Sequence, residues 1–334
     1  MSARSGAGAS LASRILAGDA RALARSISWV EAERPEGREV LKAVYPRTGR
    51  ALVLGITGPP GAGKSSLVSR LVAGWRGRGE KVGIIAVDPS SAFSGGAILG
   101  DRIRMQEHAI DPGVFIRSMA TRGHFGGVSR SSRDVVDLMD AAGYGVVLIE
   151  TVGVGQDEVE IVEIADLVLV VLPPGLGDDI QAIKAGILEI ADVFVINKAD
   201  RDGADRLESE LRAMLALAAG DPAEAPPILK TVALTGEGVP ELMEEVEGRR
   251  SGAVDSEARR RRERRRSRER FLNLLRDELL SRVRRTCLDN GMMEDLVEDL
   301  AHRRRDPYTA AEAVLEKIRF PAPRRAAMLG SRRR

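Results

Sequence analysis

A chain of 334 residues is long enough for about two domains, or for one large domain with extensions. Its formal net charge of +2 gives no strong overall attraction to nucleic acid or to an anionic membrane. The single cysteine, Cys287, excludes an intrachain disulfide and a cysteine-based metal cluster, which fits a cytoplasmic location. The amino terminus lacks the apolar region of a secretory signal, and no segment has 18 uninterrupted apolar residues, so no membrane span is expected.

Residues 1–50 are predicted to form a helical N-terminal extension. Several apolar side chains approximate one face of a helix and are interrupted at Gly18-Asp19: Leu11, Ile15, Leu16, Leu23, Ile27 and Trp29. Pro35-Glu36-Gly37 then breaks the pattern.

From residue 51 to about residue 250, short apolar runs alternate with longer amphipathic stretches. The runs are rich in Val and Ile and are predicted as strands at 51–57, 82–87, 146–149, 167–172, 193–196 and 228–232. Stretches of helical length and period lie at 64–77, 129–142, 178–190 and 204–219. This alternation predicts an α/β domain with a doubly wound, mostly parallel sheet.

Residues 251–334 show no strand pattern and are predicted as a helical C-terminal arm. The segment 258–270 is nearly all Arg and Glu, and helices are predicted at 271–283, 292–302 and 308–318. Because the charged run has mixed sign and no aromatic residues, a solvated helix is favoured over RNA binding, and no nucleic-acid partner is expected.

A phosphate-binding loop is predicted between the first strand and the helix that follows it. The segment matches G-x-x-x-x-G-K-[ST] in full, and Ser66 follows it: Gly58, Pro59, Pro60, Gly61, Ala62, Gly63, Lys64 and Ser65. The glycines let backbone N–H groups surround an anion, and the helix N-terminus adds a positive partial charge. Lys64 is the predicted charge on the β- and γ-phosphates, and the Ser65 hydroxyl suits Mg²⁺. A chance match in a Gly-rich turn is the alternative.

Asn197, Lys198 and Asp200 follow the predicted strand 193–196, at the edge of the sheet where ligands bind. A carboxylate at Asp200 can accept hydrogen bonds from N1–H and the exocyclic amine of guanine, and adenine offers neither donor there. The stem of Lys198 can cover the base, and Asn197 can tie this loop to the phosphate loop. The loop Val232, Ala233 and Leu234 is predicted to contact the guanine carbonyl. The alternative is an ordinary polar loop after a strand.

Carboxylates near the phosphate loop are predicted to direct a metal ion. Asp88 ends the second strand, Asp101 lies in the Gly-rich segment that follows, and Glu150 ends a later strand. With Ser65 they form the predicted Mg²⁺ site, and Asp88 is also a candidate for orienting water. Gly153 can donate its N–H to the γ-phosphate. Asp88-Pro89 can instead be a simple turn and Asp101 a helix cap.

A further loop is predicted to be rich in glycine and arginine: Arg117, Arg122, Gly123, Gly126, Gly127 and Arg130. This loop is predicted to contact a partner or nucleotide, and a solvated loop is the alternative.

Together these segments resemble the GTPases that accompany adenosylcobalamin-dependent acyl-CoA mutases, the MeaB/ArgK type, which includes the human methylmalonic aciduria type A protein. The resemblance covers residues 10–320 and rests on GITGPPGAGKSSL at 55–67, VDPSS at 87–91, GGAILGDRIRM at 95–105, ETVGVGQ at 150–156, GDDIQAIKAG at 177–186, NKAD at 197–200 and DPYTAA from Asp306.

The resemblance implies a P-loop NTPase with a G domain of the SIMIBI type at 51–250, a helical extension at 1–50 and a dimerisation arm at 251–334. It implies a homodimer that binds GTP, GDP and Mg²⁺, gates cofactor loading on a mutase, most often methylmalonyl-CoA mutase, and protects the mutase. Lys184 occupies the position of a switch lysine that can act in cis like an arginine finger; a surface helix lysine is the alternative.

Three other functions stay open at this point. A P-loop kinase would transfer the phosphoryl group to an acceptor, and a scaffold would bind nucleotide with little turnover. A metal-insertion GTPase is disfavoured, because His108, His124 and His302 are scattered and only one cysteine is present.

Overall fold

The computed structural model describes residues 2–89, 108, 110–121, 127–151, 161, 164–175, 190–218, 225–253, 257–285 and 291–316. The chain divides into two compact units, Met1–Gly252 and Ala253–Arg334, and each is described by itself. The three predicted domains remain a prediction.

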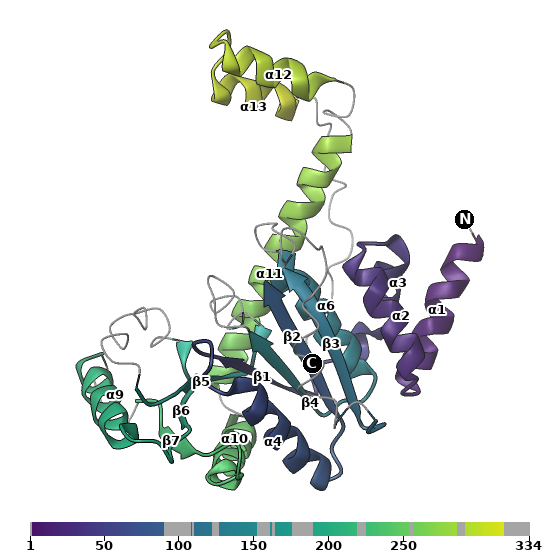
Figure 1. The fold of residues 1–334 in the computed structure, drawn as a ribbon. Coiled ribbons are helices and arrows are strands. Elements are labelled where there is room, and N and C mark those ends of the chain that lie inside the picture. Colours follow the sequence, from purple (N-terminus) through teal and green to yellow (C-terminus); the bar gives the residue numbers. More distant parts are fainter. Residues whose placement is uncertain are drawn as a thin grey trace. The chain divides into compact units, whose positions relative to one another are not determined.

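The first unit is built on a seven-stranded sheet whose described pairings are all parallel (Figure 1). The strands are β1 (Leu52–Thr57), β2 (Val82–Pro89), β3 (Val114–Thr121), β4 (Val146–Thr151), β5 (Leu167–Leu172), β6 (Val193–Asn197) and β7 (Ile228–Thr231). Their order is β3-β2-β4-β1-β5-β6-β7, with β1 in the centre. Six of them confirm the predicted strands.

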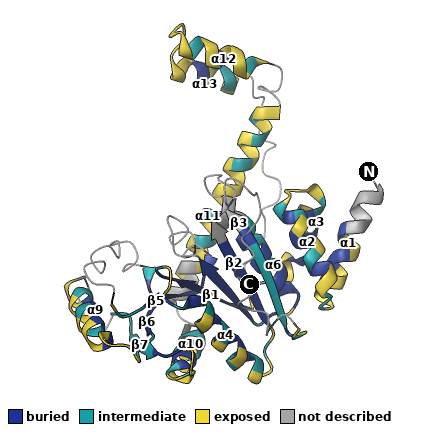
Figure 2. Ribbon diagram, in the orientation of Figure 1, coloured by how far each residue is buried: buried dark blue, intermediate teal, exposed yellow. Residues whose placement is uncertain are grey.

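Helices cover both faces of the sheet, so the doubly wound α/β prediction is confirmed. Every residue of β1, β4, β5 and β6 is buried, as the apolar runs require (Figure 2). On one face α4 (Lys64–Gly77) and α10 (Val239–Ala253) bury Leu71, Trp75 and Leu242. On the other, α6 (Gly127–Ala141) and α9 (Ala204–Ala218) contribute to a second apolar cluster.

The N-terminal extension is helical, as predicted, and packs on the α6 side of the sheet. It consists of α1 (Ser2–Leu16), α2 (Ala20–Glu31), α3 (Pro35–Val44) and the 3-10 turn η1 (Tyr45–Arg47). The break at Gly18-Asp19 has a physical reason, because the Asp19 carboxylate accepts the N–H groups of Arg21 and Ala22 and so caps α2. Ile15, Leu23 and Ile27 are fully buried in the same cluster as α6.

One buried carboxylate joins the extension to the sheet. Asp140, near the end of α6, accepts the backbone N–H groups of Gly49, Arg50 at 3.1 Å and Ala51 at 3.2 Å. Burial raises the pKa of Asp140 above its ordinary value, and the three backbone hydrogen bonds oppose that rise. The side chain therefore fixes the course of the chain just before β1.

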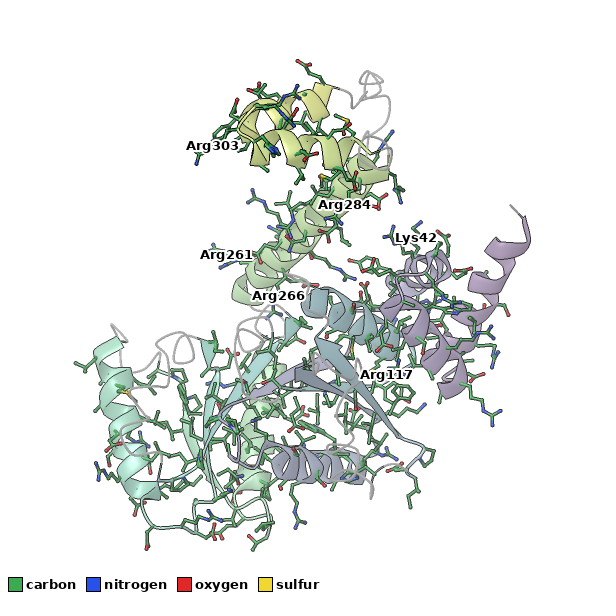
Figure 3. All side chains as sticks on the ribbon, turned by 45° about the horizontal axis from the view of Figure 1, so that its top comes forward. Lys42, Arg117, Arg261, Arg266, Arg284 and Arg303 are labelled. Carbon is green, nitrogen blue, oxygen red and sulfur yellow. The ribbon has the colours of Figure 1, made fainter. Side chains whose placement is uncertain are left out.

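The prediction of a loop around Arg117 is wrong for those of its residues that the structure describes. Arg117, which is labelled in Figure 3, lies in β3. Its guanidinium forms an ion pair with Glu31 of α2. Gly127 and Arg130 lie in α6. As an edge strand, β3 pairs with β2 alone, and several of its side chains are only half-buried, so its sequence lacks the continuous apolar run of a central strand.

The remaining members of that predicted loop, Arg122, Gly123 and Gly126, lie outside the described residues, as does the predicted helix 178–190 apart from Ile190.

The second unit contains three helices in its described residues: α11 (Glu257–Val283), α12 (Met292–Ala301) and α13 (Pro307–Glu316). The predicted helices are confirmed, and the Arg/Glu run continues into the next predicted helix as one element. Arg261 and Arg266 project from α11 in Figure 3. Large apolar side chains of α11 are exposed: Phe271, Leu272, Leu274, Leu275, Leu279 and Leu280. No helix in the described residues has the length and apolar character of a membrane span.

Candidate nucleotide-binding site

The predicted phosphate loop lies between β1 and α4, at the carboxyl edge of the sheet. Gly58 has φ +138°, and a Cβ there would lie 2.0 Å from the carbonyl oxygen of Val171 in β5. At Gly63, with φ +88°, a Cβ would lie 2.4 Å from Nδ2 of Asn197. Both positions therefore require glycine for conformation and for space, which gives the motif a steric reason in this fold.

Lys64, the first residue of α4, is 6% exposed. Its ammonium donates hydrogen bonds to the carbonyl oxygens of Gly58 at 2.8 Å and Pro59 at 3.1 Å. The ammonium of Lys64 and the positive end of α4 thus lie together beside the loop. Both favour the binding of an anion. Within the loop Ala62 is fully buried, whereas Pro60, Gly61 and Ser66 are exposed.

The next side chain, Ser65, donates a hydrogen bond from Oγ to Oε1 of Glu150 at 2.6 Å. Glu150 is 5% exposed and lies in β4, beside Ile56 of β1. Behind them the hydroxyl of Thr151 donates to that of Thr57 at 3.0 Å, which fixes the ends of the two strands together. A hydroxyl and a carboxylate side by side are hard oxygen ligands, so this pair fits Mg²⁺.

The other predicted metal and switch residues are not placed. Asp88 lies in β2, but its side chain is outside the described residues. Asp101, Gly153 and Lys184 are outside them altogether.

Asn197 connects three loops. It ends β6, is 1% exposed, and its amide donates to the carbonyl oxygen of Ala62 at 2.8 Å. Its Oδ1 accepts the Thr231 hydroxyl at 3.2 Å and the Ala233 N–H at 3.1 Å. The structure thus has the predicted tie between the base loop and the phosphate loop, and it adds one to the loop after β7.

Lys198 and Asp200 complete the base loop. Lys198 has φ +62°, uncommon for a residue with a side chain, and its ammonium donates to the Gly61 carbonyl oxygen at 2.6 Å. The Lys198 stem therefore spans from the base loop to the phosphate loop. Asp200 is exposed, so its carboxylate is accessible to a ligand.

The loop after β7 is held by a side chain of α4 that sequence reasoning missed. Val232 and Ala233 are buried and Leu234 is exposed. Arg70 of α4 donates from Nε to the Ala233 carbonyl oxygen at 2.9 Å and from Nη2 to that of Leu234. No local sequence signal marks Arg70, because its partners lie more than 160 residues away and are backbone atoms.

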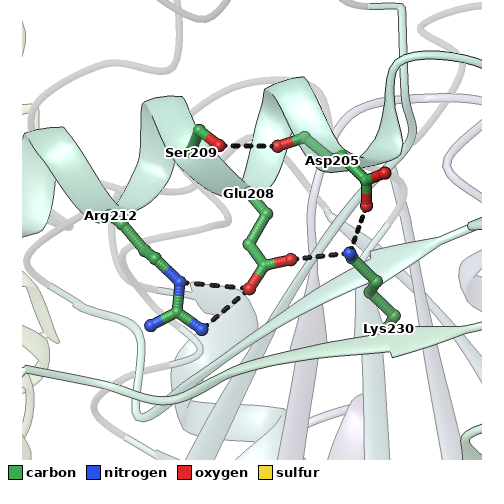
Figure 4. Close-up of polar contacts among 5 residues, drawn as sticks. All are labelled: Asp205, Glu208, Ser209, Arg212 and Lys230. Atoms are coloured by element: carbon green, nitrogen blue, oxygen red, sulfur yellow. Dashed lines mark hydrogen bonds and ion pairs between the residues drawn. The ribbon is translucent and has the colours of Figure 1, made fainter.

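A surface network supports the elements that carry these loops (Figure 4). Lys230 of β7 donates to Asp205 at 2.6 Å and to Glu208, both in α9. Arg212 also donates to Glu208. Hydrogen bonds from Lys230 and then Arg212 lower the pKa of Glu208, and those to Asp205 and Glu208 raise the pKa of Lys230.

A Gly-Lys-Ser loop at the head of α4 and an Asn-Lys-x-Asp loop tied to it, on a parallel doubly wound sheet, define a P-loop nucleotide-binding protein of the GTPase class. Residues 23–287 match the family model described as methylmalonyl-CoA mutase-associated GTPase MeaB. The chain therefore belongs to that family, and it is a GTPase whose nucleotide is a guanine nucleotide.

Individual relatives agree with the family match. A protein of Pyrococcus horikoshii named as a GTPase is 47% identical over 311 residues, which cover 92% of this chain and 97% of that one. The mitochondrial methylmalonic aciduria type A homolog of Mus musculus is 36% identical over 246 residues, covering 68% of this chain and 59% of that one. The crystal structure of a LAO/AO transport system kinase superposes with a TM-score of 0.68 at 26% identity, covering 93% and 97% of the two chains.

Proposed function

We propose that this GTPase is a chaperone of an adenosylcobalamin-dependent acyl-CoA mutase, with methylmalonyl-CoA mutase as the first candidate. It gates loading of the cofactor, protects the mutase, and uses GTP hydrolysis as the timer. The observation that carries the proposal is the match of residues 23–287 to a family whose description names that mutase. The name of the mouse relative, methylmalonic aciduria type A homolog, supports the same partner.

Within the proposed site, the loop from Gly58 to Ser65 and the Lys64 ammonium hold the phosphates. Asp200 selects the base. Ser65 and Glu150 would hold Mg²⁺, together with Asp88 and Asp101, and a bound ion would supply positive charge at the phosphate oxygens. A water oriented by Asp88 attacks the γ-phosphorus in line, and the bond from this phosphorus to the oxygen that bridges the β- and γ-phosphates breaks, which gives GDP, inorganic phosphate and a proton released to solvent. Lys184 stabilises the developing charge once the partner is bound.

The proposed active form is a cytoplasmic homodimer. The single cysteine is compatible with a reducing compartment. Support for the dimer comes from α11, where Phe271 is 62% exposed and Leu280 is 53% exposed. A run of large apolar side chains on one exposed helix is typical of a surface that another chain covers.

Binding to purified mutase tests the proposal. The chain and a methylmalonyl-CoA mutase are mixed with GDP, GTP or a non-hydrolysable GTP analogue and separated by gel filtration, and phosphate release is measured with and without mutase. We expect a complex whose stability depends on the nucleotide, and faster phosphate release in its presence. Lys64→Ala is the control for phosphate release from another source. No complex in any nucleotide state and no stimulation would exclude this partner.

Kinase activity is a second candidate, because the solved structure that superposes over 93% of this chain is titled a transport system kinase. Incubation with γ-labelled GTP separates the two functions. Label recovered as free phosphate supports a GTPase, and label retained on an acceptor molecule supports a kinase.

A further inference from the structure

The loop after β7 has nearly all its backbone donors occupied. Val232 N–H donates to the Glu237 carbonyl at 2.9 Å, Thr235 N–H to the Val232 carbonyl at 3.1 Å, and Ala233 N–H to Asn197. Among residues 232–235, all of them described, Leu234 N–H is the one donor without an acceptor in the described part of the chain. Leu234 is 79% exposed, so this donor belongs to an accessible residue.

Arg70 controls where that donor points. Its Nε holds the carbonyl oxygen of Ala233 at 2.9 Å, and this carbonyl shares a peptide plane with Leu234 N–H. In a trans peptide the C=O and N–H bonds point in opposite directions. Holding the carbonyl toward α4 therefore directs Leu234 N–H away from α4. The second bond, from Nη2 to the Leu234 carbonyl oxygen, fixes the next plane as well.

We propose that Arg70 is a positioning residue for guanine selection, acting through Leu234 N–H as the donor to the 6-carbonyl of the base. This inference rests on the proposed base site. Guanine carries an acceptor at position 6, whereas adenine carries an amino group, which would place two donors against each other. Selection at position 6 is then separate from selection by Asp200, which addresses N1–H and the 2-amino group.

The position of Arg70 on α4 gives this arrangement a second consequence. The same helix begins with Lys64 and Ser65 at the phosphate loop, and Arg70 lies about two turns further along. A single rigid helix therefore sets the spacing between the phosphate side and the base side of the site. Sequence alone does not reveal this, because Arg70 is an exposed arginine on an amphipathic helix.

The test compares nucleoside diphosphates that differ only at the base with pyrophosphate, which has no base. Calorimetry measures the affinity of wild type and Arg70→Met for GDP, IDP, ADP and pyrophosphate; inosine keeps the 6-carbonyl and lacks the 2-amino group. We expect Arg70→Met to weaken the affinity for GDP and the affinity for IDP by the same factor, about tenfold. The affinity for pyrophosphate should be unchanged. Arg70→Lys, which cannot hold both carbonyl groups in the same fork, should be intermediate and also serves if Arg70→Met fails to fold. Arg78→Met, an exposed arginine at the end of α4, is the matched control and should bind as wild type does.

Two outcomes would overturn the inference about Arg70 without contradicting the proposed base site. One is wild-type affinity of Arg70→Met for GDP. The other is a loss for pyrophosphate equal to the loss for GDP, because Arg70 would then stabilise the whole site. A wild-type protein that binds ADP as tightly as GDP would overturn the proposed base site, and this inference with it.

Discussion

Ser65 Oγ and Glu150 Oε1 lie 2.6 Å apart, although the two residues are separated by 85 positions in the chain. The contact joins the first turn of α4 to β4 and places two hard oxygen atoms beside the phosphate loop. It gives the proposed Mg²⁺ site a pair of ligands whose positions are set by the central sheet.

Replacing the carboxylate tests that pair. Glu150→Gln keeps the shape but exchanges a charged ligand for a neutral amide, which hard cations bind less well. We expect the Mg²⁺ concentration for half-maximal GTP hydrolysis to rise about tenfold. Glu241→Gln, an exposed glutamate on α10, is the matched control. An unchanged Mg²⁺ midpoint in Glu150→Gln would show that Glu150 does not hold the ion.

Asp200 is predicted to determine the base. Asp200→Asn replaces one of two acceptors by a donor, so the hydrogen bonds to guanine N1–H and the 2-amino group cannot both form. We expect the preference for GTP over ATP to fall at least tenfold in competition binding. Asp202→Asn, an exposed neighbour two residues away, should keep the preference. A variant at Asp200 that still excludes ATP would contradict the base assignment.

The Lys230 network is predicted to stabilise the fold over a defined range of pH. The lowered pKa of Glu208 means that its contribution is present above its ordinary value of 4.5 and is lost as pH falls. The raised pKa of Lys230 means that its contribution is present below its ordinary value of 10.5 and is lost at higher pH.

Lys230→Met should therefore lower the melting temperature at pH 7 by about 1 °C, since Asp205 is exposed and Glu208 is only half-buried. The difference should shrink between pH 7 and pH 3, because the contribution of Glu208 is lost as pH falls below 4.5. Lys230→Arg is the control that keeps the charge. A difference that is the same at both pH values would assign the loss to packing.

Asp140 is predicted to stabilise the junction before β1. Asp140→Asn leaves at least one of the N–H groups of Gly49, Arg50 and Ala51 without an acceptor, which costs about 1–3 kcal/mol in the free energy of unfolding. Because burial raises the pKa of Asp140, its contribution is fully present below its ordinary value of 3.8 and declines as pH rises. Urea unfolding should thus show a larger difference between wild type and variant at pH 3.5 than at pH 7. A difference in the free energy of unfolding between wild type and variant that is equal at both pH values would contradict the assignment.

The apolar side chains of α11 are predicted to mediate the proposed homodimer. Leu275→Glu with Leu279→Glu places charge among them and should yield monomers in sedimentation experiments, because a buried interface does not tolerate unpaired charge. Asn273→Glu adds the same charge at an exposed polar position of the helix and serves as the control. A double variant that sediments as wild type does would place the dimer contact elsewhere or exclude the dimer.

The central strands could be predicted from sequence because β1, β4, β5 and β6 are buried on both faces and have polar residues only at their carboxyl ends. The phosphate and base loops could be predicted because each is a short contiguous motif directly after such a strand. Asn197 could even be assigned its tie to the phosphate loop from chemistry alone, and the hydrogen bond to Ala62 is present.

The missed features depend on contacts that contiguous patterns do not record. β3 was not predicted, because this edge strand contains Arg117 and Ser118 among its apolar residues. The contacts of Arg70 and Asp140 were not predicted, because each side chain binds backbone atoms about 90 or more residues away in the sequence. Such side chains look like ordinary surface or helix residues until the fold brings their partners to them.

Asn197 bonds simultaneously to Ala62 in the loop proposed to hold the phosphates and to Ala233 in the loop proposed to contact the base. Because one amide group contacts both loops, we expect that a shift of either loop alters a hydrogen bond that Asn197 makes, and that opening at one end of the proposed site affects the other end. A partner that accelerates exchange needs to displace only one of the two loops.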